Sequence, residues 1–191
     1  MRKFFIILFL FLSFTADINA DIKRIVSGNE SAKITIIAYE SLTCSHCADF
    51  HKEVYPILKK EYIDTGLAKI EFRHFPLDVA AFNASKIVQC KEDKSLEILK
   101  SLYSNQQAWV KGNTVEEINN SLKKFLEKEG FKINFEKCVN DKEIEDFVLN
   151  DRIEGTKKFK VNATPTIIIN DKKFEKSLNY KNLKKSLEKL I

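Results

Sequence analysis

The stretch SLTCSHCADF, residues 41–50, places two cysteines three positions apart, with a serine and a histidine between them. Upstream, KITIIAYE (33–40) is short, apolar and rich in β-branched residues, which predicts a buried strand ending just before the cysteines. Downstream, apolar residues recur at helical spacing as far as Leu58, and Pro56 predicts a kink because it lacks an amide donor. The cysteine pair therefore lies at a strand-to-helix junction.

The start of a helix favours a thiolate over a thiol. Backbone N–H groups there have no intrahelical partner, and the helix dipole has its positive end there. Cys44 occupies this position, and we expect Cys47, one turn further on, to be buried. This arrangement is typical of a redox pair in which Cys44 attacks and Cys47 resolves the mixed disulfide. We expect His46 to stabilise the Cys44 thiolate further.

The rest of the chain continues an α/β pattern. AKIEFRHFPLD (68–78) alternates as a second strand, and residues 79–158 are helix-forming, predicting three or four helices and no strand. TPTIIIND (164–171) predicts a third strand, and KKFEKS (172–177) a short fourth. An α/β domain interrupted by a helical insertion fits this order, because the last strands and helix are too small to bury a core alone.

The predicted domains follow from that order. Residues 21–78 and 159–191 form one discontinuous domain, and residues 79–158 form the insertion. A closing helix within 178–191 is expected to bury three leucines, namely Leu183, Leu187 and Leu190.

The N-terminus indicates export. Residues 1–20 combine two basic residues, an apolar run and a final small residue, Ala20, which predicts a cleaved signal peptide. The apolar run is too short to span a bilayer. All four cysteines follow it, and their even number fits an oxidising compartment. The 32 Lys and Arg residues are interspersed among 27 Asp and Glu, which argues against nucleic-acid binding.

A second motif, Thr164–Pro165–Thr166, stands at the entry of the third strand. A proline there can be purely structural, because the first residue of a strand does not need a backbone N–H for the hydrogen bonds of the sheet. Together with AYESLTCSHCADFH (38–51), it resembles the thioredoxin superfamily and, within it, the DsbA family of periplasmic disulfide oxidoreductases. The resemblance covers most of the mature chain, including the helical insertion. It implies that Pro165 is cis and packs on the active-site disulfide, and that the backbone of Thr164 binds a substrate strand.

The resemblance implies a function. The chain is expected to be an exported enzyme that donates its Cys44–Cys47 disulfide to reduced, cysteine-containing proteins, with no cofactor other than that disulfide. It is expected to act as a monomer and to be reoxidised by a quinone-linked membrane protein of the DsbB type. An isomerase or reductase of the same fold is the alternative within this chemistry. Only Asp21 to Ala32 precede the first predicted strand, which argues against the N-terminal dimerisation domain of DsbC-like isomerases.

Three residues depart from the family pattern. Ser45 replaces the proline common in DsbA proteins, which leaves the redox potential open. Ala38 stands where related proteins often have an acidic residue, while Glu40 lies two positions on, and a proton-relay role for Glu40 stays open. Thr43 replaces the tryptophan of thioredoxins, which argues against a thioredoxin-like reductase.

Cys90 and Cys138 both lie in the predicted insertion. They could form a disulfide or remain two unpaired buried thiols. The resemblance allows the disulfide, since some DsbA proteins have a second bridge, and we expect the disulfide. Such a bridge would close a loop of about 49 residues, worth roughly 4 kcal/mol at most.

Other functions have weaker support. A zinc site would need a second close pair of Cys or His ligands, and none is visible beside Cys44 and Cys47. We expect His51 to be a half-exposed helix residue and His74 to be a strand-end residue, neither with a role. Trp109 could line a groove, but core packing is the better interpretation. A binding or chaperone module that uses the cysteine pair only as a staple is the alternative outside enzymes.

Overall fold

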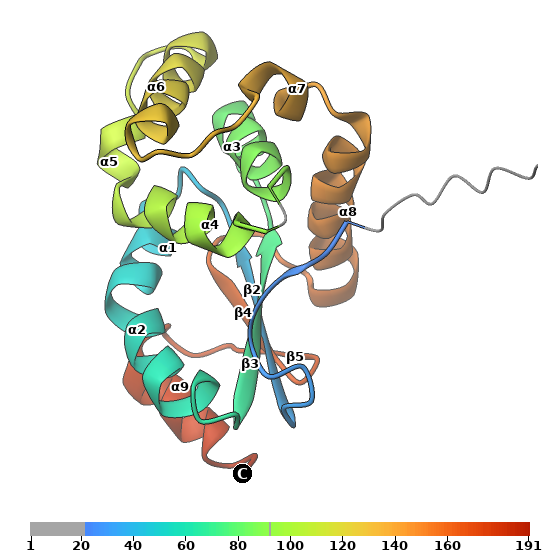
Figure 1. Cartoon of the computed structure of the whole chain (residues 1–191). Helices are drawn as coiled ribbons and strands as arrows, with labels where there is room; N and C mark the ends of the chain where they lie inside the picture. Colours follow the sequence, from blue (N-terminus) through green and yellow to red (C-terminus); the bar gives the residue numbers. More distant parts are fainter. Residues whose placement is uncertain (1–21, 92) are drawn as a thin grey trace, which may run out of the picture.

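The computed structural model describes residues 22–91 and 93–191, so the predicted signal peptide lies outside the described residues (Figure 1). A five-stranded sheet has the order β1-β3-β2-β4-β5. Strands β2 and β3 are parallel, with Ile36 opposite Ile70, and the other neighbours are antiparallel. The predicted strands are confirmed, and the bounds are β1 (Ile25–Gly28), β2 (Ile34–Glu40), β3 (Ala68–His74), β4 (Thr166–Ile169) and β5 (Lys172–Lys173).

Strand β1 was missed by the sequence analysis, which placed the first strand at 33–40. It is four residues long and ends at Gly28, so it has almost no local pattern. Its stability comes from antiparallel pairing with β3, where Ile25 lies opposite Phe72. The predicted insertion therefore follows the third strand of the sheet instead of the second.

The helix after the cysteines contains two wide turns. It begins as α1 (Ser45–Asp49), continues through a π turn at Phe50–Val54 into α2 (Tyr55–Leu58), and ends in a second π turn at Lys59–Ile63. Pro56 lies in the first turn of α2. Because proline has no N–H and crowds the preceding turn, the regular hydrogen-bond ladder cannot pass through it. The sequence analysis expected a kink at Pro56, and in the structure the helix has a π turn on each side of α2, which contains this proline.

Between β3 and β4, the described residues (75–91 and 93–165) form six helices, more than the three or four predicted. The difference arises because α5 and α7 have only four and five residues, too few to show a period. Three of the longer helices, α3, α6 and α8, begin at the capping side chains of Asp78, Thr114 and Asp141. The helices are α3 (Val79–Gln89), α4 (Ser95–Ser104), α5 (Gln106–Trp109), α6 (Val115–Lys128), α7 (Phe135–Val139) and α8 (Lys142–Phe159).

Both faces of the sheet are covered, which explains why β2 is apolar throughout. Ile36 and Ala38 face the larger core, shared with the helix after the cysteines and most of the insertion. Ile37 and Tyr39 face a smaller cluster that includes Phe159 of α8. Figure 1 shows α8 on the opposite side of the sheet from α1 and α2.

The closing helix α9 (Tyr180–Leu187) buries Leu183 and Leu187 completely, as expected. The prediction for Leu190 was wrong, since this residue lies beyond the end of α9 and is 45% exposed. Trp109 is fully buried, and its indole N–H donates to the Leu102 carbonyl at 2.9 Å, which confirms core packing.

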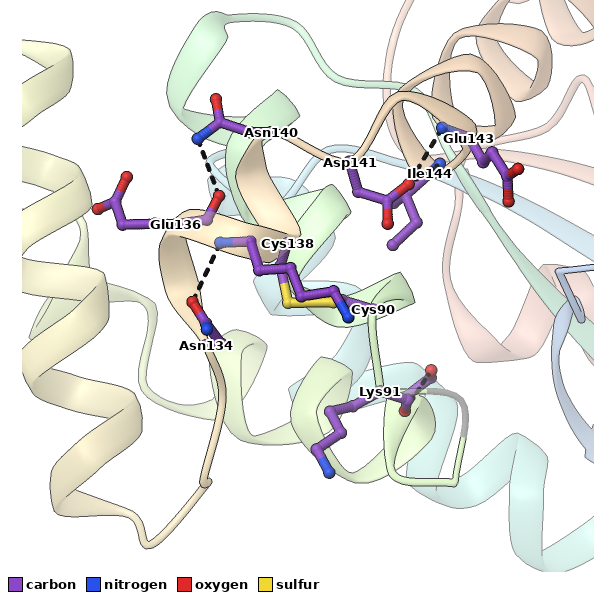
Figure 2. Close-up of a disulfide and its surroundings, with 11 residues drawn as sticks. Cys90, Lys91, Asn134, Glu136, Cys138, Asn140, Asp141, Glu143 and Ile144 are labelled. Carbon is purple, nitrogen blue, oxygen red and sulfur yellow. Dashed lines mark hydrogen bonds between the residues drawn. A yellow bond between two sulfur atoms is a disulfide. The ribbon is translucent and has the colours of Figure 1, made fainter.

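A disulfide joins Cys90, directly after α3, to Cys138 in α7, with Cα atoms 5.6 Å apart (Figure 2). The backbone N–H of Cys138 donates to the Asn134 carbonyl at 3.0 Å, so the cysteine lies in a closed helical turn. The pair is the one expected from the sequence, and it fastens the short helix α7 to α3.

Candidate active site

Cys44 is the N-cap residue of α1, and its extended backbone connects the strand segment to the helix. Its side chain is partly exposed, whereas Cys47, one turn further on, is fully buried. Both residues are free thiols in the structure. The structure therefore has one cysteine at the surface and one beneath it, as the spacing indicated.

The pKa of Cys44 is lowered to about 5. The main cause is a hydrogen bond from the Cys47 thiol, and the backbone N–H groups of Cys47 and His46 add to it, against the opposing effect of burial. Burial raises the pKa of Cys47, and its thiol interaction with Cys44 and the negative charge of Glu40 act in the same direction. At neutral pH the reduced pair therefore has a Cys44 thiolate and a protonated Cys47.

The residues between the cysteines are exposed. Ser45 is the first residue of α1, and its position leaves an amide where a proline would have none. The side chain of His46 is 82% exposed, with Nδ1 3.7 Å from Asp49 Oδ2. The contribution of His46 to the Cys44 sulfur in this structure is its backbone N–H, while a role for the ring stays a prediction.

Thr164 and Pro165 lie beside Cys44, although they are far away in sequence. The Cys44 thiol donates to the Thr164 carbonyl at 3.4 Å, and the Thr164–Pro165 peptide bond is cis. Both residues line a cavity of about 370 Å³, together with residues of α1 and the π turn. The structure thus brings together the two motifs that the sequence singled out.

Glu40 and His51 form a buried pair behind Cys47. Glu40 Oε2 lies 2.9 Å from His51 Nε2, and the two side chains are 3% and 4% exposed. The prediction that His51 is half-exposed was wrong. His51 lies in the π turn, where the extra residue per turn directs both Phe50 and His51 into the core.

The insertion holds the active-site turn in place. The side-chain amide of Gln106 donates to the carbonyls of Leu42 and Cys44, at 2.8 and 2.9 Å. The Thr43 hydroxyl donates to Asp78 Oδ2 at 2.6 Å, and Asp78 also caps α3. Sequence analysis missed Gln106 and Asp78. The position of Asp78 just before a helical segment could have indicated a capping residue. No local pattern indicates that the side chain of Gln106 contacts the active-site turn.

Metal binding finds no support among residues 22–91 and 93–191, where no three His, Cys, Asp or Glu side chains are grouped as metal ligands. Within the same described part of the chain, no helix is both long and apolar enough to cross a membrane.

Comparison with known proteins agrees with this geometry. A family model described as thioredoxin matches residues 20–189. The chain belongs to the thioredoxin family. Among solved structures, alpha-DsbA1 of Wolbachia pipientis is 30% identical, with a TM-score of 0.77 over 87% of this chain and 90% of that one. This likeness places the chain among the DsbA-type proteins of the thioredoxin family, which confirms the resemblance and the fold.

Curated relatives point the same way. Disulfide bond formation protein D of Bacillus subtilis is 26% identical to this DsbA-type chain over 174 residues, covering 86% of the chain and 75% of the relative. A relative from Rickettsia bellii, named as a protein-disulfide oxidoreductase, is 29% identical over 83% of the chain. The chain spans only 61% of the length of that relative, and 56% and 62% of two further rickettsial relatives.

Proposed function

We propose that the chain is an exported thiol:disulfide oxidoreductase that introduces disulfides into reduced, cysteine-containing proteins. The observation that carries the proposal is the low pKa of Cys44, about 5, at a helix start beside Thr164 and above a buried Cys47. A stabilised thiolate favours the reduced form of the pair, so the disulfide is a strong oxidant. The names of the relatives support disulfide chemistry in general, and the direction of electron flow is our inference.

The reaction consists of two exchanges. A substrate thiolate attacks Cys44 Sγ, the Cys44–Cys47 bond breaks, and its electron pair goes to Cys47. A second substrate thiolate then attacks the substrate sulfur of the mixed disulfide, and Cys44 leaves as a thiolate. The two substrate sulfurs end as a disulfide, and Cys44 and Cys47 end reduced.

The cavity of about 370 Å³ beside Cys44 fits an extended substrate segment. In this proposal the backbone of Thr164 and the ring of Pro165 position that segment, and His46, exposed at the same cavity, assists the Cys44 thiolate. The disulfide of the pair is the redox group, and we propose no other cofactor.

The proposal includes the cellular setting. Residues 1–20 act as a signal peptide, the enzyme works in the periplasm as a monomer, and a DsbB-type membrane protein reoxidises it. The discontinuous domain 21–78 with 159–191 supplies the chemistry, and the insertion 79–158 supports it through contacts such as Gln106 to Cys44.

The test is the redox equilibrium of the protein against glutathione, with the cysteines that change state identified by mass spectrometry. We expect a Cys44–Cys47 potential near about −120 mV, and no turnover of a reduced substrate by Cys44→Ser. A potential below about −200 mV would indicate a reductase or isomerase. A pair that never exchanges with glutathione would leave a non-catalytic binding module.

A further inference from the structure

The net positive charge of the chain is concentrated in one segment. From Lys172 to Ile191 the sequence has 7 Lys and 2 Glu, a formal excess of +5. The remaining 25 basic and 25 acidic residues, in positions 1–171, balance each other. Basic and acidic residues alternate along the whole chain, yet its entire net charge of +5 comes from the segment that begins with β5.

This segment contains a cavity with an apolar wall. The cavity has a volume of about 550 Å³ and is lined by β5, the residues that follow it and the end of α9. Ile169, Phe174 and Leu190 supply the apolar wall. Leu190 is 45% exposed and Ile191, the next residue, is 70% exposed. Large apolar side chains are therefore open to solvent in the cavity and next to it.

The charged residues that line this cavity are mostly basic, namely Lys172, Lys173, Lys176 and Lys189, together with Glu175. Lys173 donates to the Lys160 carbonyl at 3.3 Å. Among the described residues, no ion pair includes Lys172, Lys176 or Lys189, whereas Lys184 of α9 pairs with Glu61 at 2.9 Å. Three ammonium groups at the cavity are therefore available to a ligand.

The neutral polar side chains of the cavity already have hydrogen bonds within the protein. Asn170 Oδ1 accepts from the backbone N–H of Thr35 at 2.8 Å, and the Ser186 hydroxyl donates to the Asn182 carbonyl at 3.1 Å. The cations are thus the main groups left to bind a partner. A partner that fits has an apolar part for the wall and negative charge for the lysines.

The edge of the sheet offers little to an extended peptide. Strand β5 has two residues and follows a turn in which Asn170 and Asp171 have φ angles of 44° and 61°. An added strand would therefore find few backbone groups to pair with. A second copy of the chain fits no better, because its own lysines would face these lysines.

Two other anionic partners are also disfavoured. The segment from Lys172 onward contains no arginine, the residue that pairs best with phosphates and bases of nucleic acids. A single soluble anion would neutralise one or two of the lysines. Because the lysines come from β5, from the residues after it and from α9, they form a surface that matches many negative groups at once.

The cavity and the active site lie at opposite ends of β2. The backbone N–H of Asn170 donates to the Thr35 carbonyl, near the start of β2, whereas Cys44 follows the end of this strand at Glu40. Figure 1 shows α9 at the end of the molecule opposite α6 and α7. A partner bound at the cavity therefore leaves Cys44 accessible.

We propose that the surface formed by Lys172, Lys176, Lys189 and Leu190 docks on a membrane that contains anionic lipids. The three ammonium groups contact the lipid headgroups, and Leu190 with the apolar wall contacts the upper part of the acyl chains. The docking is peripheral and reversible, since a few lysines and a small apolar area give weak attachment. It is independent of the redox function of Cys44 and Cys47.

The test is co-sedimentation with lipid vesicles. It uses the chain from Asp21 onward, because both buried cores lie within that part and the preceding apolar run would itself bind lipid. Vesicles of phosphatidylcholine alone are compared with vesicles that contain increasing fractions of phosphatidylglycerol. We expect binding that rises with phosphatidylglycerol and weakens between about 0.1 and 1 M salt, as the Debye length falls from about 10 to about 3 Å.

Two double variants with the same charge separate the surface from net charge. Lys172→Gln with Lys189→Gln is the test, and Lys123→Gln with Lys124→Gln, on the exposed face of α6, is the matched control. Each lysine at an anionic surface contributes about fivefold to binding, so the test variant should bind about 25-fold more weakly. The control should bind like wild type, and both variants should keep glutathione exchange at Cys44. Equal weakening of the two variants would overturn the site.

The apolar contact has its own variant. Leu190→Ser should weaken vesicle binding several-fold and leave the salt dependence unchanged, and an unchanged affinity would overturn the contact with acyl chains. Thermal unfolding shows that each variant is folded.

Other probes identify a different partner. Wild-type protein that ignores vesicles rich in phosphatidylglycerol at low salt would overturn the docking, and binding of duplex DNA instead would assign the surface to nucleic acid. Monomeric dihexanoylphosphatidylglycerol that binds as tightly as the vesicles would replace membrane docking by a site for a single lipid.

Discussion

The hydrogen bond from Cys47 to Cys44 can be tested by comparing two substitutions at one position. Because this bond is the main cause of the Cys44 pKa of about 5, Cys47→Ala should raise that pKa, whereas Cys47→Ser retains a hydroxyl donor and should leave it near 5. A hydrogen bond to a charged group contributes about 1.5–3 kcal/mol. At about 1.36 kcal/mol per pKa unit this corresponds to about 1–2 units.

Solvent reduces the effect because Cys44 is partly exposed, so we take the lower end, about 1 unit, for Cys47→Ala. The assay is the ultraviolet absorbance of the thiolate as a function of pH. The Cys90–Cys138 disulfide does not contribute a titrating thiol, which leaves Cys44 as the group observed. Equal titration of the alanine and serine variants would refute the hydrogen bond as the cause and leave the helix amides as the source of the low pKa.

The lowered pKa of Cys44 determines how the stability of the folded protein changes with pH. The folded reduced protein gains stability from the Cys44 thiolate, fully present above the unfolded thiol pKa of about 8.5 and lost as the pH falls through about 5. The alanine variant should lose this contribution at a higher pH than the serine variant, which urea unfolding at a series of pH values would measure.

Two further predictions concern the insertion. Gln106→Ala removes both hydrogen bonds to the active-site turn, so it should lower the free energy of unfolding by about 1–3 kcal/mol; urea unfolding checks this, and the exposed neighbour Gln107→Ala should change it little. Replacing Cys90 and Cys138 by alanine opens a loop with a sequence separation of 48 and should lower the stability by up to about 4 kcal/mol. The same variant should still exchange its other two cysteines with glutathione, and loss of exchange would contradict a purely structural bridge.

Most of the fold could be predicted from local sequence patterns. The strands before Cys44 and after Thr164 are short runs of apolar, β-branched residues, and the helix after the cysteines has apolar residues at helical spacing; each of these elements is present. The elements that sequence missed are short. Strand β1 and helices α5 and α7 have four or five residues each, and they exist because a neighbour supplies the hydrogen bonds or the apolar surface that they lack.

By itself the sequence determined the reactive pair, because a helix start, two cysteines one turn apart and their exposure all follow from neighbouring residues. Only the tertiary structure decided what surrounds that pair. The Thr164 carbonyl reaches Cys44 across 120 residues, and Gln106 reaches it across 62. The burial of His51 against Glu40 depends on a π turn and on the packing of α4. Contacts between distant residues depend on how whole elements pack, and no local pattern records that packing.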